Sequence, residues 1–255
     1  MKGLNFEEVL IGKKILVLIP HPDDEIIGVG GTMALLKGTN TEVDCVCISS
    51  SGIPTVDGKY TAKSRNEARI QEWHSVMKRL GVHKEYINST YGDNFPFLEK
   101  LKNDTPEIIS HINPKEYDFI FVPSFFENHV EHRFLTYTFL PKLLRKGRKR
   151  GQNIVLYEVW SLISTVTDYV DISNYIDEKM ELLRMYKTQC DYVDYDVRVK
   201  GLNLYRGHMG GRVQYAEAFW VMKTFTFKII AFGLKIALNL SLIHISEPTR
   251  HSLIS

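Results

Sequence analysis

The sequence contains few cysteines, no excess of either charge and no long apolar run near its start. Only three cysteines occur among 255 residues, and Cys45 and Cys47 stand two positions apart in an apolar segment. Two thiols on one strand face are poorly placed to bridge each other, so we expect reduced cysteines and a reducing compartment. Lys and Arg total 32 against 30 Asp and Glu, and this net charge of +2 gives no reason to expect nucleic acid as a partner.

The first apolar run, residues 15–19, ends after five residues at Pro20. A secretion signal needs roughly 7–15 apolar residues and a small-residue cleavage site, and the sequence shows neither. We therefore expect a cytoplasmic protein, and a peripheral position at the inner face of the membrane stays open. With 44% hydrophobic and 24% charged residues, the composition is that of a globular domain.

The end of the chain differs from the rest. Residues 240–250 read LSLIHISEPTR, which looks like the in-frame translation of a transposase mosaic-end sequencing adapter. We therefore expect residues 240–255 to be an assembly artefact. Residues 223–239 form an apolar segment of unknown role, interrupted by Lys228 and Lys235, that falls short of the roughly 20 residues a spanning helix needs. A helix packed on the core and a helix lying in an interface are both open for it.

Short apolar runs alternate with segments of helical periodicity along the rest of the chain. Buried strands are predicted at 15–19, 43–48, 86–87, 118–122 and 153–159. Helices are predicted after residue 31 and at 62–80, 106–112 and 133–144. Strands that alternate with helices indicate a parallel sheet with right-handed crossovers. The predicted fold is a single Rossmann-like α/β domain over residues 1–222, with a mainly parallel sheet flanked by helices.

Glycines at positions 28, 30 and 31 follow the first predicted strand. They suggest a dinucleotide-binding loop, but the sequence lacks G-x-G-x-x-G and an acidic ribose ligand about 20 residues later. Close packing of a helix on a strand explains these glycines better.

Polar clusters follow two of the predicted strands, at the edge where α/β sheets bind ligands. HPDDE occupies residues 21–25, and HVEH occupies residues 129–132. Three adjacent carboxylates repel one another unless a cation lies among them. Imidazole and carboxylate groups are the usual ligands of a catalytic zinc, which takes three protein groups and leaves a fourth position for water. The two clusters together therefore predict one metal site.

With these motifs the sequence resembles the LmbE-like, or PIG-L, family of zinc-dependent N-deacetylases. The resemblance extends from about residue 14 to residue 219. It rests on IPHPDDE at 19–25, SRNEA at 64–68, RLGV at 79–82, PSFFENHVEH at 123–132, YKTQ at 186–189 and YAEAF at 215–219. It implies hydrolysis of an N-acetyl group from an N-acetylglucosamine-type sugar, within a glycolipid, a nucleotide sugar or a glycoconjugate, releasing acetate and a free amine.

The resemblance gives each polar residue of the two motifs a role. It implies that His21, Asp24 and His132 bind one Zn²⁺ per chain. It implies that Asp23 is the general base and that a protonated His129 stabilises the oxyanion and donates a proton to the leaving amine. Adjacent residues of an extended segment point to opposite sides, which agrees with different roles for the two aspartates.

Four further residues are candidates for supporting roles. The family's second motif usually reads His-Pro-Asp-His, and its aspartate is expected to orient a metal-binding histidine without binding the metal itself. Glu131 replaces this aspartate here and is expected to act in the same way. Glu25 is likewise expected to support the metal ligands without binding the metal. Arg65 matches a family position near the substrate, and Asp93 lies where family members have a loop carboxylate that holds sugar hydroxyls. A helix salt bridge and a turn-forming aspartate are the alternatives for these two.

Two other functions stay open. A metal-dependent sugar-nucleotide transferase would use Asp23 and Asp24 to hold Mg²⁺ or Mn²⁺ against a diphosphate, without needing two histidines. The second alternative function is that of a non-catalytic sugar-binding module.

The basic stretch 142–150 is expected to be a solvated helix end, with attraction to an anionic substrate or a membrane surface as the alternative. The expected partner is an acetylated amino sugar and not a nucleic acid; the oligomeric state is not predicted.

Overall fold

A seven-stranded sheet runs through the middle of the molecule, in the order β3-β2-β1-β4-β5-β7-β6. The computed structural model describes residues 5–210 and 213–244, with side chains up to residue 237. The strands are β1 (Lys14–Ile19), β2 (Glu42–Cys47), β3 (Lys84–Ile87), β4 (Phe119–Pro123), β5 (Asn153–Tyr157), β6 (Asp168–Asp171) and β7 (Ala216–Lys223). β1 to β5 are parallel, whereas β7 is antiparallel to both β5 and β6. The order of the five parallel strands is the one found in Rossmann-type sheets.

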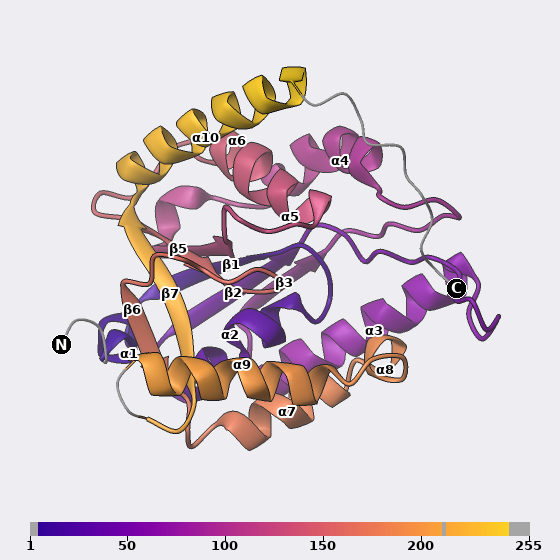
Figure 1. Ribbon diagram of the computed structural model, residues 1–255, viewed down its shortest axis with the longest axis horizontal. Coiled ribbons are helices and arrows are strands. Elements are labelled where there is room, and N and C mark those ends of the chain that lie inside the picture. Colours follow the sequence, from indigo (N-terminus) through magenta and orange to yellow (C-terminus); the bar gives the residue numbers. More distant parts are fainter. Residues whose placement is uncertain (1–4, 211–212, 245–255) are drawn as a thin grey trace.

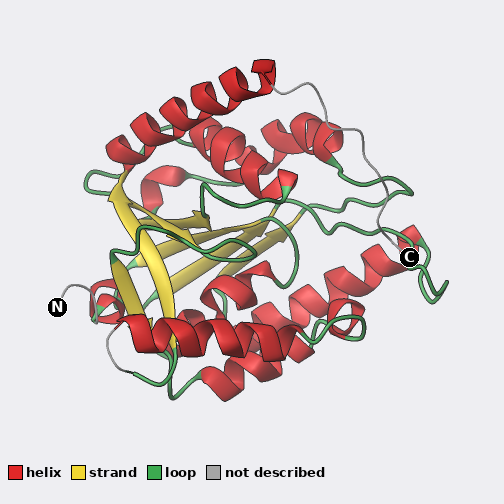
Figure 2. Ribbon diagram, viewed as in Figure 1, coloured by secondary structure: helices red, strands yellow, loops and turns green. Residues whose placement is uncertain are grey.

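Helices cover both faces of the sheet, as Figures 1 and 2 show. One layer contains α1 (Phe6–Leu10), α2 (Asp24–Leu36), α3 (Ala62–Leu80), α7 (Ile176–Arg184), α8 (Lys187–Cys190) and α9 (Tyr195–Gly210). The other contains α4 (Leu98–Ser110), α5 (Val130–Phe134), a π-helical turn (Leu135–Phe139), α6 (Leu140–Leu143) and α10 (Thr224–His244). A short 3₁₀ turn (Pro114–Glu116) precedes β4. The predicted single α/β domain with a mainly parallel sheet is confirmed.

β1 supplies both hydrophobic cores, because successive side chains of a strand point to opposite faces. Ile15, Val17 and Ile19 pack into the core beneath α2 and α3. Leu16 and Leu18 pack into the core beneath the α4–α6 layer. This explains why the strand reads as an unbroken apolar run and not as an alternating one.

Most predicted elements of the parallel half agree with the structure to within a few residues, and α3 occupies the predicted 62–80. The helix predicted after residue 31 instead begins at Asp24, so the three glycines lie inside it. Thr61 and Ser64 form a capping box at its start, and Gly81 ends it with φ 69. The helix predicted at 106–112 instead spans Leu98–Ser110 with Pro106 inside it. Its buried Leu101 and Ile108 show that packing against the core outweighs the hydrogen bond that proline removes.

The glycines of α2 allow the close packing that the sequence predicts, but the contact is with the far part of the sheet. A Cβ added to Gly28 would lie 2.3 Å from the Tyr157 ring at the end of β5. A Cβ on Gly31 would lie 2.7 Å from the Ile172 side chain, just after β6. These close contacts therefore fix α2 against the end of β5 and the segment that follows β6.

The apolar segment 223–239 continues directly from β7 into α10. Phe227 and Ala231 of this helix are buried in the core beneath it. Residues 240–244 of the expected artefact form the end of α10, and residues 245–255 lie outside the described residues. Within the described chain, no helix combines the length and apolar character needed to cross a membrane.

Candidate metal centre and substrate pocket

The first motif occupies the sharp connection between β1 and α2. Asp24 is the first residue of α2, and its Oδ2 accepts a hydrogen bond from the backbone N–H of His21 at 3.1 Å. The same oxygen lies 3.2 Å from Nδ1 of the His21 ring. Asp23 precedes the helix with φ 106, a conformation that strains any residue with a side chain and that occurs mostly at functional sites. Among the described non-glycine residues, only Ser51 also has a positive φ.

The second motif lies beside the first because β1 and β4 are neighbours in the sheet. His132 is fully buried in α5, and its Nε2 lies 3.1 Å from Oδ2 of Asp24. His129 is the residue before this helix, and its ring centroid is 4.8 Å from that of His132 and 4.9 Å from that of His21. Residues more than 100 positions apart in the sequence thus form one polar cluster.

Three of these side chains fit a zinc ion. Oδ2 of Asp24 is 3.2 Å from Nδ1 of His21 and 3.1 Å from Nε2 of His132. Ligand atoms at about 2.0 Å from a tetrahedral zinc are about 3.3 Å apart, so these separations match. Nε2 of His132 is buried and, among the described residues, has no hydrogen-bond partner despite the nearby carboxylate. The three histidines also offer nitrogens within 4.8 Å of one another, so His129 borders the same centre.

Two buried glutamates lie behind the histidines. Oε2 of Glu131 is 2.5 Å from Nε2 of His21, which leaves Nδ1 of that ring facing Asp24. Oε2 of Glu127 is 3.3 Å from Nδ1 of His132, while its Oε1 accepts hydrogen bonds from the backbone N–H groups of Val159 and Ser161. Carboxylates in such positions orient metal-binding imidazoles. Sequence reasoning assigned no role to Glu127, although it lies within the quoted motif.

The acidic surroundings change the pKa values of the cluster. Burial, together with the charge of Asp24, raises the pKa of Asp23 to about 7. Burial alone would raise the pKa of Asp24 as well, but His132 and His21 lower it well below its usual range. Burial opposes protonation of His132, yet Asp24 and Glu127 raise its pKa to about 10. A site that attracts a proton this strongly also favours a metal cation in the proton's place.

The pKa values of His129 and Glu25 shift in opposite directions. Burial and the neighbouring His21 and His132 lower the pKa of His129 to about 4, so its ring is neutral at pH 7. Burial raises the pKa of Glu25 to about 8, against the effect of the Tyr186 hydroxyl that donates a hydrogen bond to it. Glu25 Oε2 accepts a hydrogen bond from the backbone N–H of Asp23 at 3.2 Å and so supports the strained turn.

A cavity of about 260 Å³ opens above the cluster. Its lining consists of His21, Asp23, Asp24, Ser51, Ile53, Arg65, Arg69, Phe95, His129, Trp160, Gln189 and Tyr195. Arg65 is held in place by hydrogen bonds from its Nη2 to the Thr188 carbonyl and to Oε1 of Gln189. Asp93 is exposed in its loop and is not among the described residues that line the cavity.

Sequence reasoning gave no role to seven of the lining residues, among them Arg69, Trp160 and Tyr195. Arg69 is buried and donates a hydrogen bond to the Pro22 carbonyl, so its charge lies beneath the first motif. Its position four residues after Arg65 on a predicted helix was a signal for it. Trp160 and Tyr195 form an aromatic pair with ring centroids 5.3 Å apart at the rim. Their segments meet only in the folded chain, so no local pattern could have paired them.

Comparison with known proteins identifies similar deacetylases. Residues 16–141 match the family model described as PIG-L, GlcNAc-PI de-N-acetylase. The chain is 24% identical over 221 residues to a diacetylchitobiose deacetylase of Thermococcus kodakarensis, covering 80% of this chain and 81% of the relative. Its fold is similar to that of the N,N'-diacetylchitobiose deacetylase from Pyrococcus horikoshii, with a TM-score of 0.63, 25% identity and coverage of 82% of this chain and 84% of the other.

The fold also occurs in an enzyme of another class. A 4-carboxy-2-hydroxymuconate hydratase from Pseudomonas putida has a TM-score of 0.58 and 16% identity, covering 83% of this chain and 96% of the hydratase. Likeness at this level of identity concerns the fold alone. The reaction therefore depends on the residues of the site and not on the fold.

Proposed function

Because residues 16–141 of this chain match the family model of the PIG-L de-N-acetylases, we propose that the protein is a zinc-dependent hydrolase. It removes the N-acetyl group from an N-acetylglucosamine-type sugar and releases acetate and a free amine. The observation that carries this proposal is the convergence of His21, Asp24 and His132, with one carboxylate oxygen within 3.2 Å of both imidazoles. The named deacetylases among the relatives support the same reaction class.

His21, Asp24 and His132 would hold one zinc ion per chain. When bound, zinc supplies Lewis acidity, which polarises an amide carbonyl and lowers the pKa of an attacking water. Glu131 and Glu127 fix the orientation of the two imidazoles through their second ring nitrogens.

Asp23 is proposed as the general base. Its Oδ2 is buried and has no hydrogen-bond partner within the described residues, so it is free to accept a proton. In the metal-free protein the pKa of Asp23 is raised to about 7, and a bound zinc would lower it, so the carboxylate is ionised and able to take a proton near neutral pH. Asp23 takes the proton from the attacking water and returns it to the sugar nitrogen as the C–N bond breaks.

His129 is proposed to stabilise the oxyanion. The family resemblance implies a protonated imidazole, but a pKa of about 4 makes the neutral form dominant at pH 7. A neutral ring still carries one N–H, which can donate a hydrogen bond to the charge that develops on the carbonyl oxygen. The proton for the leaving amine then comes from Asp23, which has just collected it.

The rim of the cavity supports a sugar substrate. Phe95 and Trp160 are exposed at the cavity, and Trp160 packs against Tyr195. Aromatic faces of this kind suit the apolar face of a sugar ring, while Arg65 and Gln189 offer polar groups for its hydroxyls. The partly open cavity leaves room for the remainder of a conjugate outside it.

The three cysteines are free thiols in the structure. Burial raises the pKa of Cys45 and Cys47 well above the ordinary value, so these thiols are unreactive. We infer that the protein works in a reducing compartment, the cytoplasm.

Metal analysis combined with acetate release tests the proposal. The expected result is about one zinc per chain, acetate release from an acetylated amino sugar, and loss of both in His132→Ala. Dependence on Mg²⁺ with no zinc would favour the sugar-nucleotide transferase. Zinc without acetate release from any acetylated amino sugar would refute the deacetylase.

A further inference from the structure

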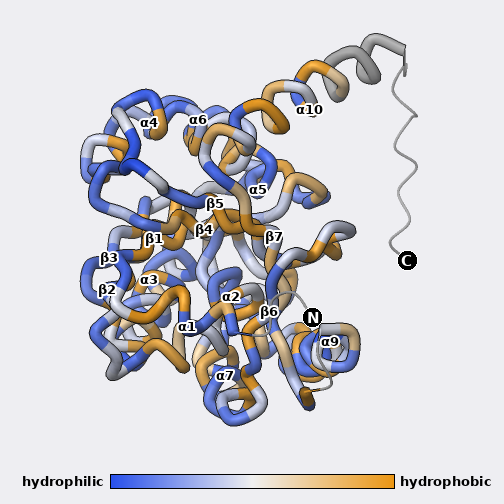
Figure 3. Tube along the Cα trace, turned by 90° about the vertical axis from the view of Figure 1, so that its left-hand side faces the viewer, coloured by the Kyte–Doolittle hydropathy of each residue, from blue (hydrophilic) through white to orange (hydrophobic). Residues whose placement is uncertain are grey.

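α10 exposes a row of large apolar side chains on the outside of the molecule. Phe225, Ile229, Phe232 and Ile236 are 64%, 56%, 68% and 43% exposed. Their spacing of four, three and four residues puts them on one face of the helix, since each residue advances by about 100°. Phe227 lies on the opposite face and is fully buried. Figure 3 shows α10 as a largely apolar helix at the edge of the molecule.

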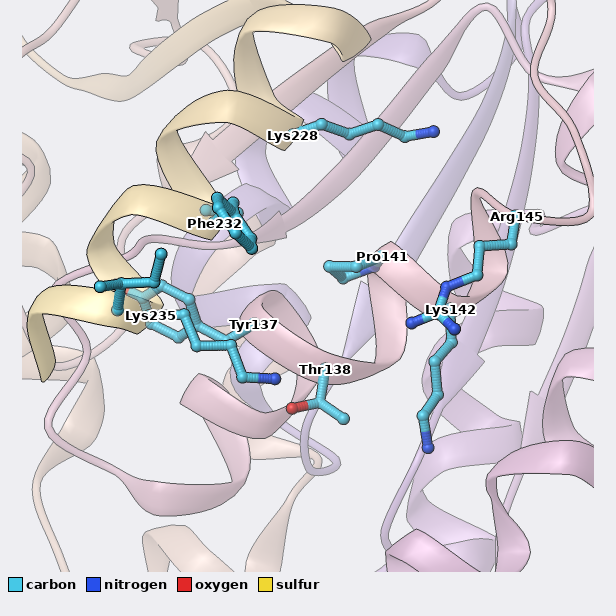
Figure 4. Close-up of a pocket in the computed structure, with 10 residues that line it drawn as sticks. Tyr137, Thr138, Pro141, Lys142, Arg145, Lys228, Phe232 and Lys235 are labelled. Atoms are coloured by element: carbon cyan, nitrogen blue, oxygen red, sulfur yellow. The ribbon is translucent and has the colours of Figure 1, made fainter. Parts of the chain in front are cut away.

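A basic groove lies beside this apolar row. It has a volume of about 540 Å³ and runs between α10 and the stretch from the π-helical turn to the residues after α6. Lys228 and Lys235 extend into it from α10, and Lys142 and Arg145 stand on the other side, as Figure 4 shows. None of the four forms an ion pair with a described residue. The described lining contains no acidic residue, so the groove offers four uncompensated cations.

The same combination recurs at the start of α10. Phe225, the first residue of the apolar row, lines a second cavity of about 160 Å³ together with Arg148, Arg150 and Lys223. Lys149 of that cavity pairs with Asp118 and is therefore partly neutralised. Cations thus accompany the apolar row from its beginning to its end. The whole of α10 contains no Asp or Glu.

We propose that this surface, the apolar row of α10 with its flanking cations, docks on a membrane that contains anionic phospholipids. The row enters the boundary between headgroups and acyl chains, and the basic side chains contact the lipid phosphates. A helix with an apolar face and lysines beside it binds bilayers in this way, and anionic lipids strengthen the binding. A second copy of the chain is a poorer occupant, because a two-fold contact would set both groups of cations against each other.

Co-sedimentation with vesicles tests this proposal on the full chain. The two vesicle types are phosphatidylcholine alone and phosphatidylcholine with about one-third phosphatidylglycerol, the anionic lipid supplying the surface charge. The expected result is binding to the anionic vesicles that weakens with added salt, and little binding to the neutral ones. Lys228→Gln/Lys235→Gln should weaken binding roughly 25-fold, at about fivefold for each lysine. Lys63→Gln/Lys78→Gln on α3, in the opposite helix layer, is the matched control and should bind as the unaltered protein does.

A second pair of variants tests the apolar row. Ile229→Ser/Phe232→Ser should reduce binding at any salt concentration, whereas Val197→Ser/Leu204→Ser, which changes exposed residues of α9, should not. Equal binding to both vesicle types, no binding, or unchanged binding by the Lys228/Lys235 variant would overturn the proposal. A stable dimer that Ile229→Ser/Phe232→Ser dissociates, without vesicle binding, would show that a second copy covers the row. Acetate release from a soluble acetylated sugar should be the same in all variants, so this test is independent of the proposed reaction.

Discussion

Replacing Asp23 with asparagine should make the metal-free protein more stable and the enzyme nearly inactive. Asparagine has the same shape and accepts a positive φ more readily than most residues, so the turn before α2 is kept. It removes the base while leaving His21, Asp24 and His132 in place. We expect turnover to fall by roughly 10²- to 10⁴-fold, with zinc content unchanged.

The gain in stability follows from the pKa of Asp23, which burial raises from 3.8 in the unfolded chain to about 7 in the folded protein. The folded state therefore binds this proton more tightly than the unfolded state does. The free energy of unfolding accordingly falls as the pH rises from about 4 to about 7, and the loss levels off above pH 7. At 1.36 kcal/mol for each pH unit, the loss is on the order of 4 kcal/mol at pH 8 and below about 2 kcal/mol at pH 5. Asp23→Asn lacks this loss.

Urea unfolding in the presence of a chelator, at pH 5 and pH 8, measures the effect. Asp24→Asn is the matched control, because the neighbouring histidines lower the pKa of Asp24. That variant should lose stability at neutral pH, where the carboxylate is charged, and should also lose zinc. If Asp23→Asn were no more stable at pH 8 than the unaltered protein, or gained equally at both pH values, the assignment of Asp23 as a buried, destabilised carboxylate would be wrong.

Three other substitutions separate the remaining roles. His129→Ala should lower kcat by roughly 10²- to 10³-fold and keep its zinc, as metal analysis of the purified variant would check. Trp160→Ala should raise KM for an acetylated amino sugar several-fold with a smaller change in kcat, and an equal loss with a bare acetamide would contradict sugar stacking. Lys179→Met should destabilise the fold by about 3–5 kcal/mol in urea unfolding, because it leaves the buried Glu217 without its cation.

The sequence predicts the parallel half of the fold well because its information there is local. An apolar run buried on both faces, followed by a polar turn and a helix, identifies β1 and α2 without knowledge of the rest of the chain. The meeting of His21 with His132 also follows from the pattern, since both motifs come after parallel strands and so lie at one edge of the sheet.

The unpredicted parts depend on contacts between distant segments. β7 is antiparallel and pairs with β5 and β6, and nothing in its own composition states that direction. Glu127 becomes important only because the residues that follow β5 turn their backbone N–H groups toward it. Arg69 likewise acquires a role only because α3 packs below the turn at Pro22. The order of strands in the sheet creates these contacts, and periodicity along the chain does not encode that order.

The strained, acidic turn at residues 23–25 leads into α2, and β7 and α7 hold this helix in place. Glu217 of β7 accepts hydrogen bonds from the backbone N–H groups of Gly31 and Thr32 and is itself paired with the buried Lys179. Lys179 also donates a hydrogen bond to the Ile27 carbonyl, so Glu217 and Lys179 both hold the backbone in the middle of α2. Gly28 also lets the Tyr157 ring pack against the same helix. Contacts along a whole turn of α2 therefore hold it in place against the repulsion among the carboxylates of residues 23–25. Gly28 and Gly31 therefore have a packing role in anchoring α2, and this role does not require the spacing of a nucleotide-binding loop.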